Sequence, residues 1–411
     1  MEDDGRRTDL DASGVRLAAV KQVNLRMHFG RKGVSLWLAS TVIALALSSG
    51  GCGSVRLGGQ SSPPDLATRP AATESGGSSP SLTSVCAISA TEAWVAGDGT
   101  IAKTDDGGRS WERQYQGPEW VTHLDFVDGE HGWAVGRDSL LVTSDGGRRW
   151  TAAGEPEQRL WDVAFVDAAM GYGVTGGQRD LKPPQDHQYA ELLSEVGGGG
   201  LVKTEDGGNT WTSVSAPTGV EAFAFETAAL GWVAGSDGIY ATDDGGKTWA
   251  RKGTFPAQAS PTSPGEPLWL DLKSAGTDTL WAEVGYGRYA GGMGFALYRS
   301  SDGGTTWRSV TGSGRDLATA PGPLAVVDSR SAYLFGLQAG TWLTLGRTDD
   351  GGEAWTSALP LAQTVAASPE DASFVDSSHG WGVVRVMSTR SYAIIVTDDG
   401  GRTWRTSSEV R

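Results

Sequence analysis

The amino-acid sequence predicts an all-β protein folded as a seven-bladed β-propeller of four-stranded antiparallel blades. After residue 81 an eight-residue motif recurs seven times, at intervals of 38 to 61 residues. An aromatic residue precedes each copy within an apolar run, and turn residues separate short strand-like segments throughout. Four short antiparallel strands repeated many times along a chain are typical of propellers.

The composition excludes several other classes of protein. The 411 residues include 60 glycines and 17 tryptophans but only 2 cysteines, and the formal net charge is -15. Two cysteines exclude a disulfide-stapled or zinc-finger scaffold, and the acidic balance argues against binding to nucleic acid. A polytopic membrane protein needs several apolar runs of about 20 residues, whereas this chain has one shorter run.

The N-terminal part, residues 1–52, has the layout of a signal peptide. Residues 34–47 form an apolar stretch that follows basic residues and is too short to span a bilayer comfortably. The small residues directly before Cys52 resemble a bacterial lipoprotein leader, which implies lipid attachment at Cys52. Ser49 departs from that pattern, so an uncleaved anchor or ordinary secretion stays open, and Met27 is an alternative start. We expect an extracytoplasmic chain attached to the outer side of the bacterial cytoplasmic membrane.

Residues 53–80 predict a disordered tether, because Gly, Ser and Pro dominate and no apolar period is present. We expect the propeller over residues 81–411. Cys86 falls in an alternating apolar run near its start, so we expect it to be a small buried residue without a redox role.

The repeated motif is Ser/Thr-x-Asp-Gly-Gly-x-x-Trp, and its residue types fit a tight turn. A carboxylate can accept N–H bonds from its own turn, paired glycines permit positive φ, and the tryptophan can bury its ring between sheets. The motif resembles the Asp-box, or BNR, repeat. We expect structural roles for its residues, which are Asp106, Asp145, Asp206, Asp244, Asp302, Asp350 and Asp399 with Trp111, Trp150, Trp211, Trp249, Trp307, Trp355 and Trp404.

Each unit is predicted to contain four strands, named A to D in chain order. In the second unit they are residues 122–127, 132–135, 139–143 and 149–152. Because every unit has its own strands A and D, we expect the ring to close by packing between blades. A short strand near Ser81 that joins the last blade is an alternative. Strand B carries the upstream aromatic residue of each unit, in chain order Trp94, Trp133, Tyr172, Trp232, Trp281, Tyr333 and Trp381.

Differences in length between the units fall mainly between strands B and C. Insertions there include residues 176–200 in the third unit, 286–289 in the fifth and 388–390 in the seventh. In a propeller the B–C turns share one face, and the A–B turns share the other face with the motif loops. We therefore predict that the working surface lies opposite the motif loops. Arginine and aromatic residues on such insertions are the usual anchors of recognition. The candidate partner-binding residues are Arg179, His187, Tyr189, Arg288, Tyr289 and Arg390.

Catalysis is the main alternative, because sialidases and other glycan-cleaving enzymes carry Asp-boxes on propellers. The chain has no Arg-Ile-Pro signature of sialidases, and Glu283 near Tyr286 and Arg288 is more simply a strand residue. Seven equivalent loops spaced around a ring cannot converge on one substrate, and they lack the distal glutamate of a calcium-binding loop. We expect no catalytic residues, no metal and no cofactor.

A second resemblance concerns the whole repeat. The Gly-Trp-x-x-Gly segments at residues 132–136 and 231–235, together with the His-Gly-Trp turns at His131 and His379, resemble the photosystem II assembly and stability factor family and its bacterial relatives. In the photosynthetic members the propeller is a non-catalytic assembly factor that engages a reaction-centre subunit. The resemblance implies a protein-binding role here.

These observations together predict a non-catalytic docking propeller, monomeric and tethered to a membrane, that binds an extracytoplasmic or membrane protein. Glycan binding or glycoside hydrolysis on an Asp-box propeller is the alternative function. A purely structural envelope component is the third, since a propeller fold does not itself select a function.

Overall fold

The computed structural model describes most of the chain after residue 79. The predicted leader and all but the last residue of the predicted tether, with Cys52, lie outside the described residues. The described residues are 80–137, 139–154, 159–176, 199–235, 237–255, 267–289, 292–311, 322–338, 342–358, 360–361 and 365–410.

Described residues form antiparallel strands in six hydrogen-bonded sheets. The first sheet has six strands, which are β1 (Leu82–Ala87), β2 (Ala93–Thr104), β3 (Glu112–Phe126), β4 (Gly132–Gly136), β5 (Leu140–Thr143) and β6 (Thr151–Ala152). The second has four, which are β7 (Leu160–Phe165), β8 (Gly171–Thr175), β9 (Gly200–Thr204) and β10 (Thr212–Val214). The third has β11 (Ala222–Phe225), β12 (Gly231–Gly235), β13 (Gly238–Thr242) and β14 (Ala250–Gly253).

The remaining three sheets also have four strands each. The fourth consists of β15 (Pro267–Ser274), β16 (Leu280–Tyr289), β17 (Gly292–Ser300) and β18 (Arg308–Ser309). The fifth consists of β19 (Leu324–Val326), β20 (Ala332–Gln338), β21 (Trp342–Thr348) and β22 (Thr356–Ala358). The sixth consists of β23 (Ala367–Phe374), β24 (Gly380–Val386), β25 (Ser391–Thr397) and β26 (Arg405–Thr406).

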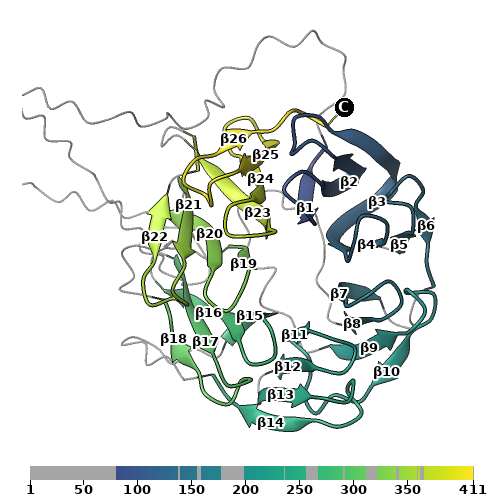
Figure 1. Ribbon diagram of the computed structural model, residues 1–411, viewed down its shortest axis with the longest axis vertical. Coiled ribbons are helices and arrows are strands. Elements are labelled where there is room, and N and C mark those ends of the chain that lie inside the picture. Colours follow the sequence, from purple (N-terminus) through teal and green to yellow (C-terminus); the bar gives the residue numbers. More distant parts are fainter. Residues whose placement is uncertain are drawn as a thin grey trace, which may run out of the picture. The chain divides into compact units, whose positions relative to one another are not determined.

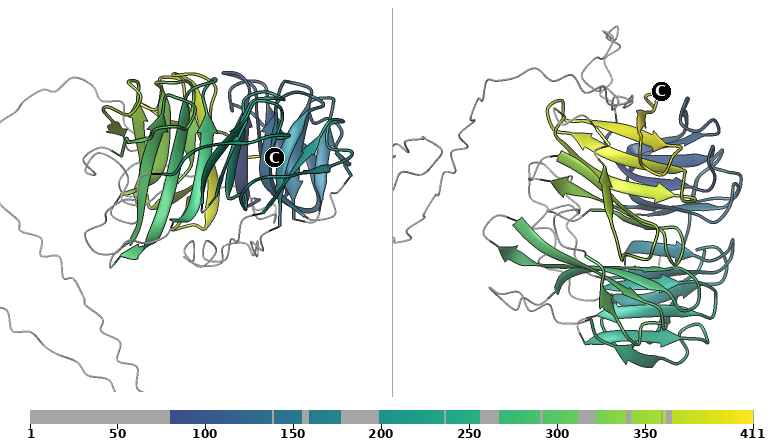
Figure 2. Two further views of the ribbon diagram at one scale, coloured as in Figure 1. Left: turned by 90° about the horizontal axis from the view of Figure 1, so that it is seen from below. Right: turned by 60° about the vertical axis from the view of Figure 1, so that its left-hand side comes forward.

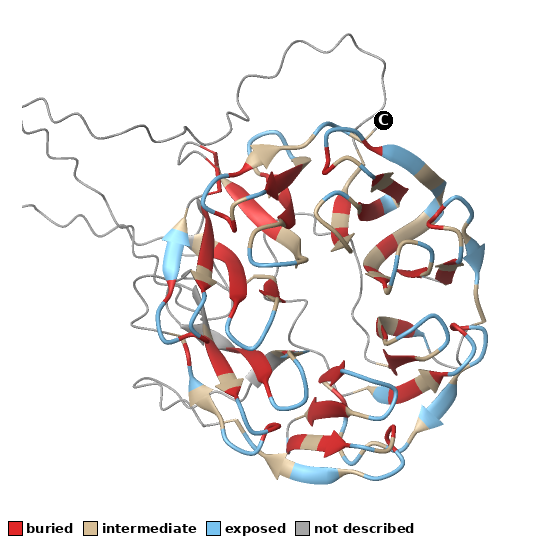
Figure 3. Cartoon of the chain, in the orientation of Figure 1, coloured by how far each residue is buried: buried red, intermediate tan, exposed pale blue. Residues whose placement is uncertain are grey.

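These sheets stand around a common axis, which makes the fold an all-β propeller with four-stranded blades (Figure 1). The side views show the strands of neighbouring sheets running roughly side by side around the ring (Figure 2). Strands β7, β11, β15, β19 and β23 lie nearest the axis, and burial is greatest in the middle strands of each sheet (Figure 3). The short outer strands β6, β10, β14 and β22 are largely exposed.

The prediction of seven separate blades is wrong in its count, because the first two sequence units share one sheet. Strand β3 pairs with β2 through Glu112–Trp120 and with β4 through Val121–Phe126, so it ends the first unit and begins the second without a break. Strand β2 likewise runs through the segments predicted as strands B and C of the first unit. Seven sequence units are thus distributed over six sheets.

Contacts between successive units repeat around the ring. The strand B aromatic of one unit stacks flat on a phenylalanine at the end of strand A in the next unit. The ring of Trp133, for example, also donates its Nε1–H to the Gly207 carbonyl of the next loop at 2.9 Å. The stacked pairs, with centroid separations, are Trp94–Phe126 (3.7 Å), Trp133–Phe165 (3.5 Å), Tyr172–Phe225 (3.3 Å) and Tyr333–Phe374 (3.7 Å).

A glycine lies beneath each of these phenylalanines. Phe126 pairs across the ladder with Gly132, and a Cβ at Gly132 would lie 2.2 Å from the phenylalanine ring. The same holds for the pairs Phe165–Gly171, Phe225–Gly231 and Phe374–Gly380. The other three units replace phenylalanine and glycine together, by Ala87 with Ala93, Ser274 with Leu280, and Val326 with Ala332.

The two ends of the folded unit meet by packing and by side-chain hydrogen bonds. Residues of β1 and β2 share a buried cluster with residues of β24 and β25. Asp371 of β23 accepts hydrogen bonds from Val85 N at 2.9 Å and Ser84 Oγ at 2.8 Å. The strand that follows Ser81, β1, pairs with β2 and not with a strand of the last sheet. Within the described ranges, no helix has the length and apolarity needed to cross a membrane.

Substitution of Gly132 by alanine tests the glycine–phenylalanine rule. The added Cβ would press on the Phe126 ring, so we expect Gly132→Ala to lower the free energy of unfolding by about 1–3 kcal/mol. Urea unfolding measures the change. Gly129→Ala is the matched control, because a Cβ there would have no neighbour closer than 3.4 Å. Equal stability of the two variants would contradict the rule.

Candidate functional site: the loop face, the axis and a pocket beside Trp232

The motif loops share one hydrogen-bonding scheme. In the first, Asp106 Oδ1 accepts from Arg109 N and Ser110 N at 2.9 Å each, and Asp106 Oδ2 accepts from Ser110 Oγ at 2.6 Å. Thr104 Oγ1 donates to Asp106 Oδ1 at 2.8 Å and accepts from Gly108 N at 2.9 Å. The paired glycines have φ of 73° and 80°, which an L-residue rarely adopts.

These hydrogen bonds stabilise the ionised form of each loop carboxylate. Donation by the Thr248 hydroxyl and backbone lowers the pKa of Asp244 to about 2, and the same kind of contact with Ser110 lowers the pKa of Asp106. The carboxylates therefore hold their own turns together. Among the described residues, no group of three or more His, Cys, Asp or Glu side chains is placed to hold a metal ion.

The loop carboxylates should make the protein sensitive to acid. Their folded-state pKa values lie below the unfolded value, so their stabilising effect is present above about pH 4 and is lost as pH falls further. We expect the urea midpoint to fall between about pH 4 and pH 2, and to fall less in Asp244→Asn. Asp243→Asn is the control, because Asp243 takes no part in the loop bonds. An identical acid profile in Asp244→Asn would refute this account.

A second group of ionisable residues lies on the innermost strands. His123 Nε2 lies 3.7 Å from Asp162 Oδ1, and Lys273 Nζ lies 3.2 Å from Asp271 Oδ1. Asp125 Oδ2 accepts from Phe165 N at 2.6 Å, as Asp371 does from the strand β1. The sequence analysis did not single these residues out. Their position in the repeat could have identified them. One ionisable residue lies three residues before the end of strand A in four units, namely His123, Asp162, Asp271 and Asp371.

Burial raises the pKa of three carboxyl groups near the axis. The pKa of Asp125 rises to about 6, and burial also raises the pKa of Asp371. Glu283 is 1% exposed, and burial with the nearby Asp271 raises its pKa well above the usual value. Glu283 accepts from the Gly322 backbone, so each of the three holds a backbone N–H of a neighbouring sheet. Glu283 is a buried residue of β16, and its Oε1 has no hydrogen-bond partner among the described residues.

The raised pKa of Asp125 predicts a pH effect of opposite sign to that of the loops. An acid whose folded pKa exceeds its unfolded value favours folding in the protonated form, so stability should rise as pH falls from about 7 towards 4. Asparagine can still accept from Phe165 N without carrying charge. We expect Asp125→Asn to flatten this part of the stability profile in urea titrations. A variant with the slope of the parent protein would contradict the assignment.

A pocket of about 430 Å³ lies on the loop face, between the sheets β11–β14 and β15–β18. We name it the Trp232 pocket. Its wall includes the apolar side chains of Leu230, Trp232 and Trp249 and the ionisable side chains of Asp243, Lys252, Asp278 and Asp302. Thr277 and Gly303 also line it, from the A–B turn and the motif loop of the fifth unit.

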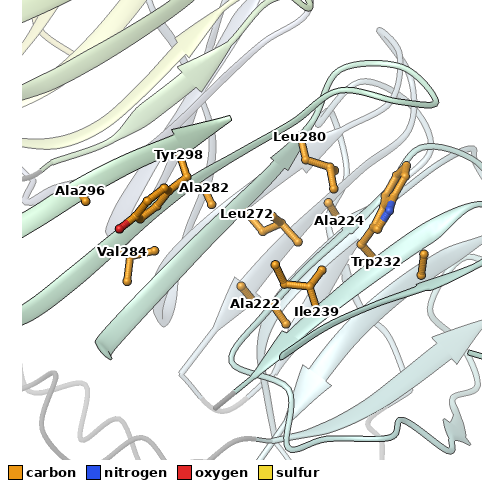
Figure 4. Packing of buried hydrophobic residues seen from close by; sticks show 12 residues of the cluster. Ala222, Ala224, Trp232, Ile239, Leu272, Leu280, Ala282, Val284, Ala296 and Tyr298 are labelled. Atoms are coloured by element: carbon orange, nitrogen blue, oxygen red, sulfur yellow. The ribbon is translucent and has the colours of Figure 1, made fainter. Parts of the chain in front are cut away.

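Two departures from the repeat coincide with this pocket. Where other units place phenylalanine against the strand B aromatic, the fifth unit has Ser274. Leu280 packs with Trp232 in the same cluster and takes up part of the space (Figure 4). The residue before the motif Ser/Thr is a cation in four units but Ala241 in the fourth, and Ala241 lines the pocket. Of these two positions only residue 241 lines the cavity, which therefore lies where the cation of other units is absent.

Few of the predicted partner-binding residues can be placed. Arg179, His187 and Tyr189 lie outside the described residues, as do the side chains of Arg288 and Tyr289, whose backbone ends β16. Arg390 is exposed in the turn between β24 and β25, with φ of 55°. That turn lies at the opposite end of the strands from the loops, because A–B turns bond to the motif loops, as in Gly400 N to Ser378 O at 2.7 Å. The preference for the B–C face stays a prediction.

The cysteine at the start of the propeller is free. Cys86 is partly buried in β1, beside the cluster that contains Trp94 and Phe126. Burial and the nearby carboxylate of Asp125 raise the pKa of its thiol. A thiol held protonated is a poor nucleophile.

Comparison with known proteins identifies the fold. The structure of YCF48 bound to a D1 peptide superposes with a TM-score of 0.53 at 16% identity, over 82% of this chain and 99% of that chain. The likeness is one of fold. A GH74 xyloglucanase from Xanthomonas campestris superposes with a TM-score of 0.53 at 16% identity, over 81% of this chain. An ancestral GH74 enzyme does so with a TM-score of 0.53 at 15% identity, over 80% of this chain.

The two GH74 enzymes are longer proteins. The chain spans 55% of the Xanthomonas enzyme and 46% of the ancestral enzyme. No protein-family model and no curated protein sequence matches the chain. The structural likeness therefore extends to propellers that bind a peptide and to propellers of glycan-cleaving enzymes alike.

Proposed function

We propose that this protein is a non-catalytic docking propeller that binds an extended segment of another extracytoplasmic or membrane protein. In this proposal the leader ends in a lipid-modified Cys52, and the tether lets the ring reach partners at the outer side of the membrane. From the resemblance to photosystem II assembly factors we take only the general role of a platform that binds a polypeptide. Experiment must identify the partner.

The commitment of the carboxylates to structural contacts carries this proposal. A glycoside hydrolase needs a general acid and a second carboxylate, both in contact with the sugar. In the described parts of the chain, the carboxyls with clearly raised pKa already accept backbone N–H groups from adjacent sheets. The loop carboxylates have lowered pKa values and bond within their own turns. These contacts give both groups structural roles within the ring, which favours docking over hydrolysis as the proposed function.

The similarity to YCF48 supports a peptide as the bound species. That propeller holds a D1 peptide, and the present chain covers nearly all of its length. Propellers present rigid faces, and partner segments bind there without a large change in the platform. A pocket that mixes tryptophan with carboxylates on the loop face offers one point of attachment.

Site-specific crosslinking in intact cells tests the proposal. A photoreactive amino acid is placed at Asp278, on the rim of the Trp232 pocket, at Arg390 on the opposite face, and at Thr151 on the exposed outer strand β6 as a control. We expect a discrete adduct from one face and none from Thr151. The captured protein, once purified, should rebind the propeller in solution.

Two outcomes would reject this function. The first is a folded protein that forms no position-dependent adduct at either face. The second is release of reducing sugar from β-glucans or xyloglucan by the purified protein, lost on substitution of an axial carboxylate such as Asp162. That second result would establish the hydrolase alternative.

A further inference from the structure

We propose that the Trp232 pocket binds an arginine side chain of the partner segment. The inference rests on the proposed function and specifies one contact within it. Its main support is internal, because other units of the same ring show which side chain fills the equivalent space.

In three units a cationic side chain lies over the strand B aromatic. Lys103 Nζ is 4.7 Å from the centroid of Trp94. The guanidinium of Arg299 is 5.7 Å from the ring of Trp281, and the guanidinium of Arg347 is 5.8 Å from the ring of Tyr333. Such cation–π contacts contribute about 0.5–2 kcal/mol each.

Each of these cations stands directly before the Ser or Thr of its motif. The fourth unit has Ala241 at that place, so its motif supplies no cation over Trp232, and the ammonium in the pocket comes from Lys252 of strand β14. Ala241 is 7% exposed and lines the pocket. A guanidinium arriving from outside would therefore occupy the volume that the side chain of residue 299 or 347 fills in its own unit.

The acceptors for a guanidinium are also present in the pocket. Arg299 Nε donates to the Ser329 carbonyl at 3.0 Å, and Arg347 Nη1 donates to the Gly400 carbonyl at 3.0 Å. Both acceptors belong to the following unit, one in its A–B turn and one in its motif loop. Thr277 and Gly303 hold the same two places in the fifth unit, and both line the pocket.

Backbone hydrogen bonds establish this equivalence. The first glycine of the motif donates to the A–B turn of its own unit, at 2.9 Å from Gly303 N to Asp278 O and at 2.8 Å from Gly351 N to Arg330 O. Thr277 precedes Asp278 just as Ser329 precedes Arg330. The Thr277 carbonyl is therefore placed to receive a guanidinium that enters from the partner, whereas the Gly303 carbonyl already accepts from Trp232 Nε1 at 3.1 Å.

Charge favours a cation in this pocket. Three carboxylates line it, those of Asp243, Asp278 and Asp302, against the single ammonium of Lys252. Asp302 is engaged by its own loop, whereas Asp243 and Asp278 are exposed at the rim. Asp243 corresponds in the motif to Asp349, which bonds to Arg347 Nε at 3.0 Å. Arginine fits better than lysine, because a planar guanidinium can stack beside an indole while its N–H groups reach carbonyls.

Peptide binding to the full chain tests the inference. The probe is the blocked tripeptide Gly-Arg-Gly, compared with the same peptide containing citrulline or lysine, by saturation-transfer NMR and titration. We expect the arginine peptide to bind with a dissociation constant on the order of 1 mM and the citrulline peptide to bind roughly tenfold more weakly. Equal binding of the arginine and citrulline peptides, or no binding of the arginine peptide, would overturn the proposal.

Two arginine substitutions, one inside the pocket and one at the same motif position of another unit, provide a matched pair of variants. Ala241→Arg places a guanidinium where its counterparts have one, and we expect roughly tenfold weaker peptide binding. Val142→Arg makes the same change at the same motif position of the second unit, away from the pocket, and should leave binding unaltered. Equal binding by these two variants would refute the assignment of the pocket. Should Ala241→Arg fail to fold, the double variant Asp243→Lys, Asp278→Lys reverses the rim charge and should abolish binding.

The experiments distinguish failure of the docking function from failure of the arginine contact. Capture of a partner through the photoreactive probe at Arg390, undiminished by Ala241→Arg, would keep the docking function and remove the arginine contact. Loss of capture at Asp278 in Ala241→Arg but not in Val142→Arg would support both.

Discussion

Aromatic stacking between successive units is the contact on which the ring depends. A strand B ring covers the phenylalanine of the next unit in four places, and a glycine beneath that phenylalanine makes the room. Stacking of this kind contributes about 0.5–1.5 kcal/mol beyond the burial of area. Hydrogen bonds such as Tyr172 Oη to the Ala228 carbonyl, at 2.7 Å, fix the ring against the following loop. The stacked rings set the spacing between neighbouring sheets, and this spacing in turn positions the surface turns.

The side chains between successive units differ from one interface to the next where the stacked phenylalanine is missing. The interfaces that lack a stacked phenylalanine use other means, such as the Arg299 guanidinium over Trp281 with Trp355 edge-on to that indole. At the interface that leads into the fifth unit, Ala241 stands where other units have a cation, and a pocket lies beside it. A repeat protein can thus keep its ring intact with most of its interfaces and leave one free to bind a ligand.

Much of the architecture follows from sequence pattern, because turn chemistry and aromatic placement are local and repeat seven times. The limits of strands B, C and D of the second unit agree with the structure to within two residues, whereas the predicted strand A is only the last part of the longer β3. The shared sheet does not follow from pattern. Gly117-Pro118 marks a turn in most sequences, yet β3 passes through it with a register shift, where a residue without N–H can be accommodated. The pocket could not be predicted from the sequence either, because it depends on the small side chain of Ala241, and only a comparison with the other units shows which side chain is missing there. The carboxylates near the axis could not be predicted from the sequence, because a single acidic residue in a strand forms no recognisable motif.

The unbroken strand β3 also bears on how the ring could be cut and rejoined. New termini succeed at exposed connections where few backbone bonds cross. An opening within β3 does not meet that condition, because it would sever ladders to both β2 and β4. Circular permutation should therefore fail between the first two units, which one continuous strand joins.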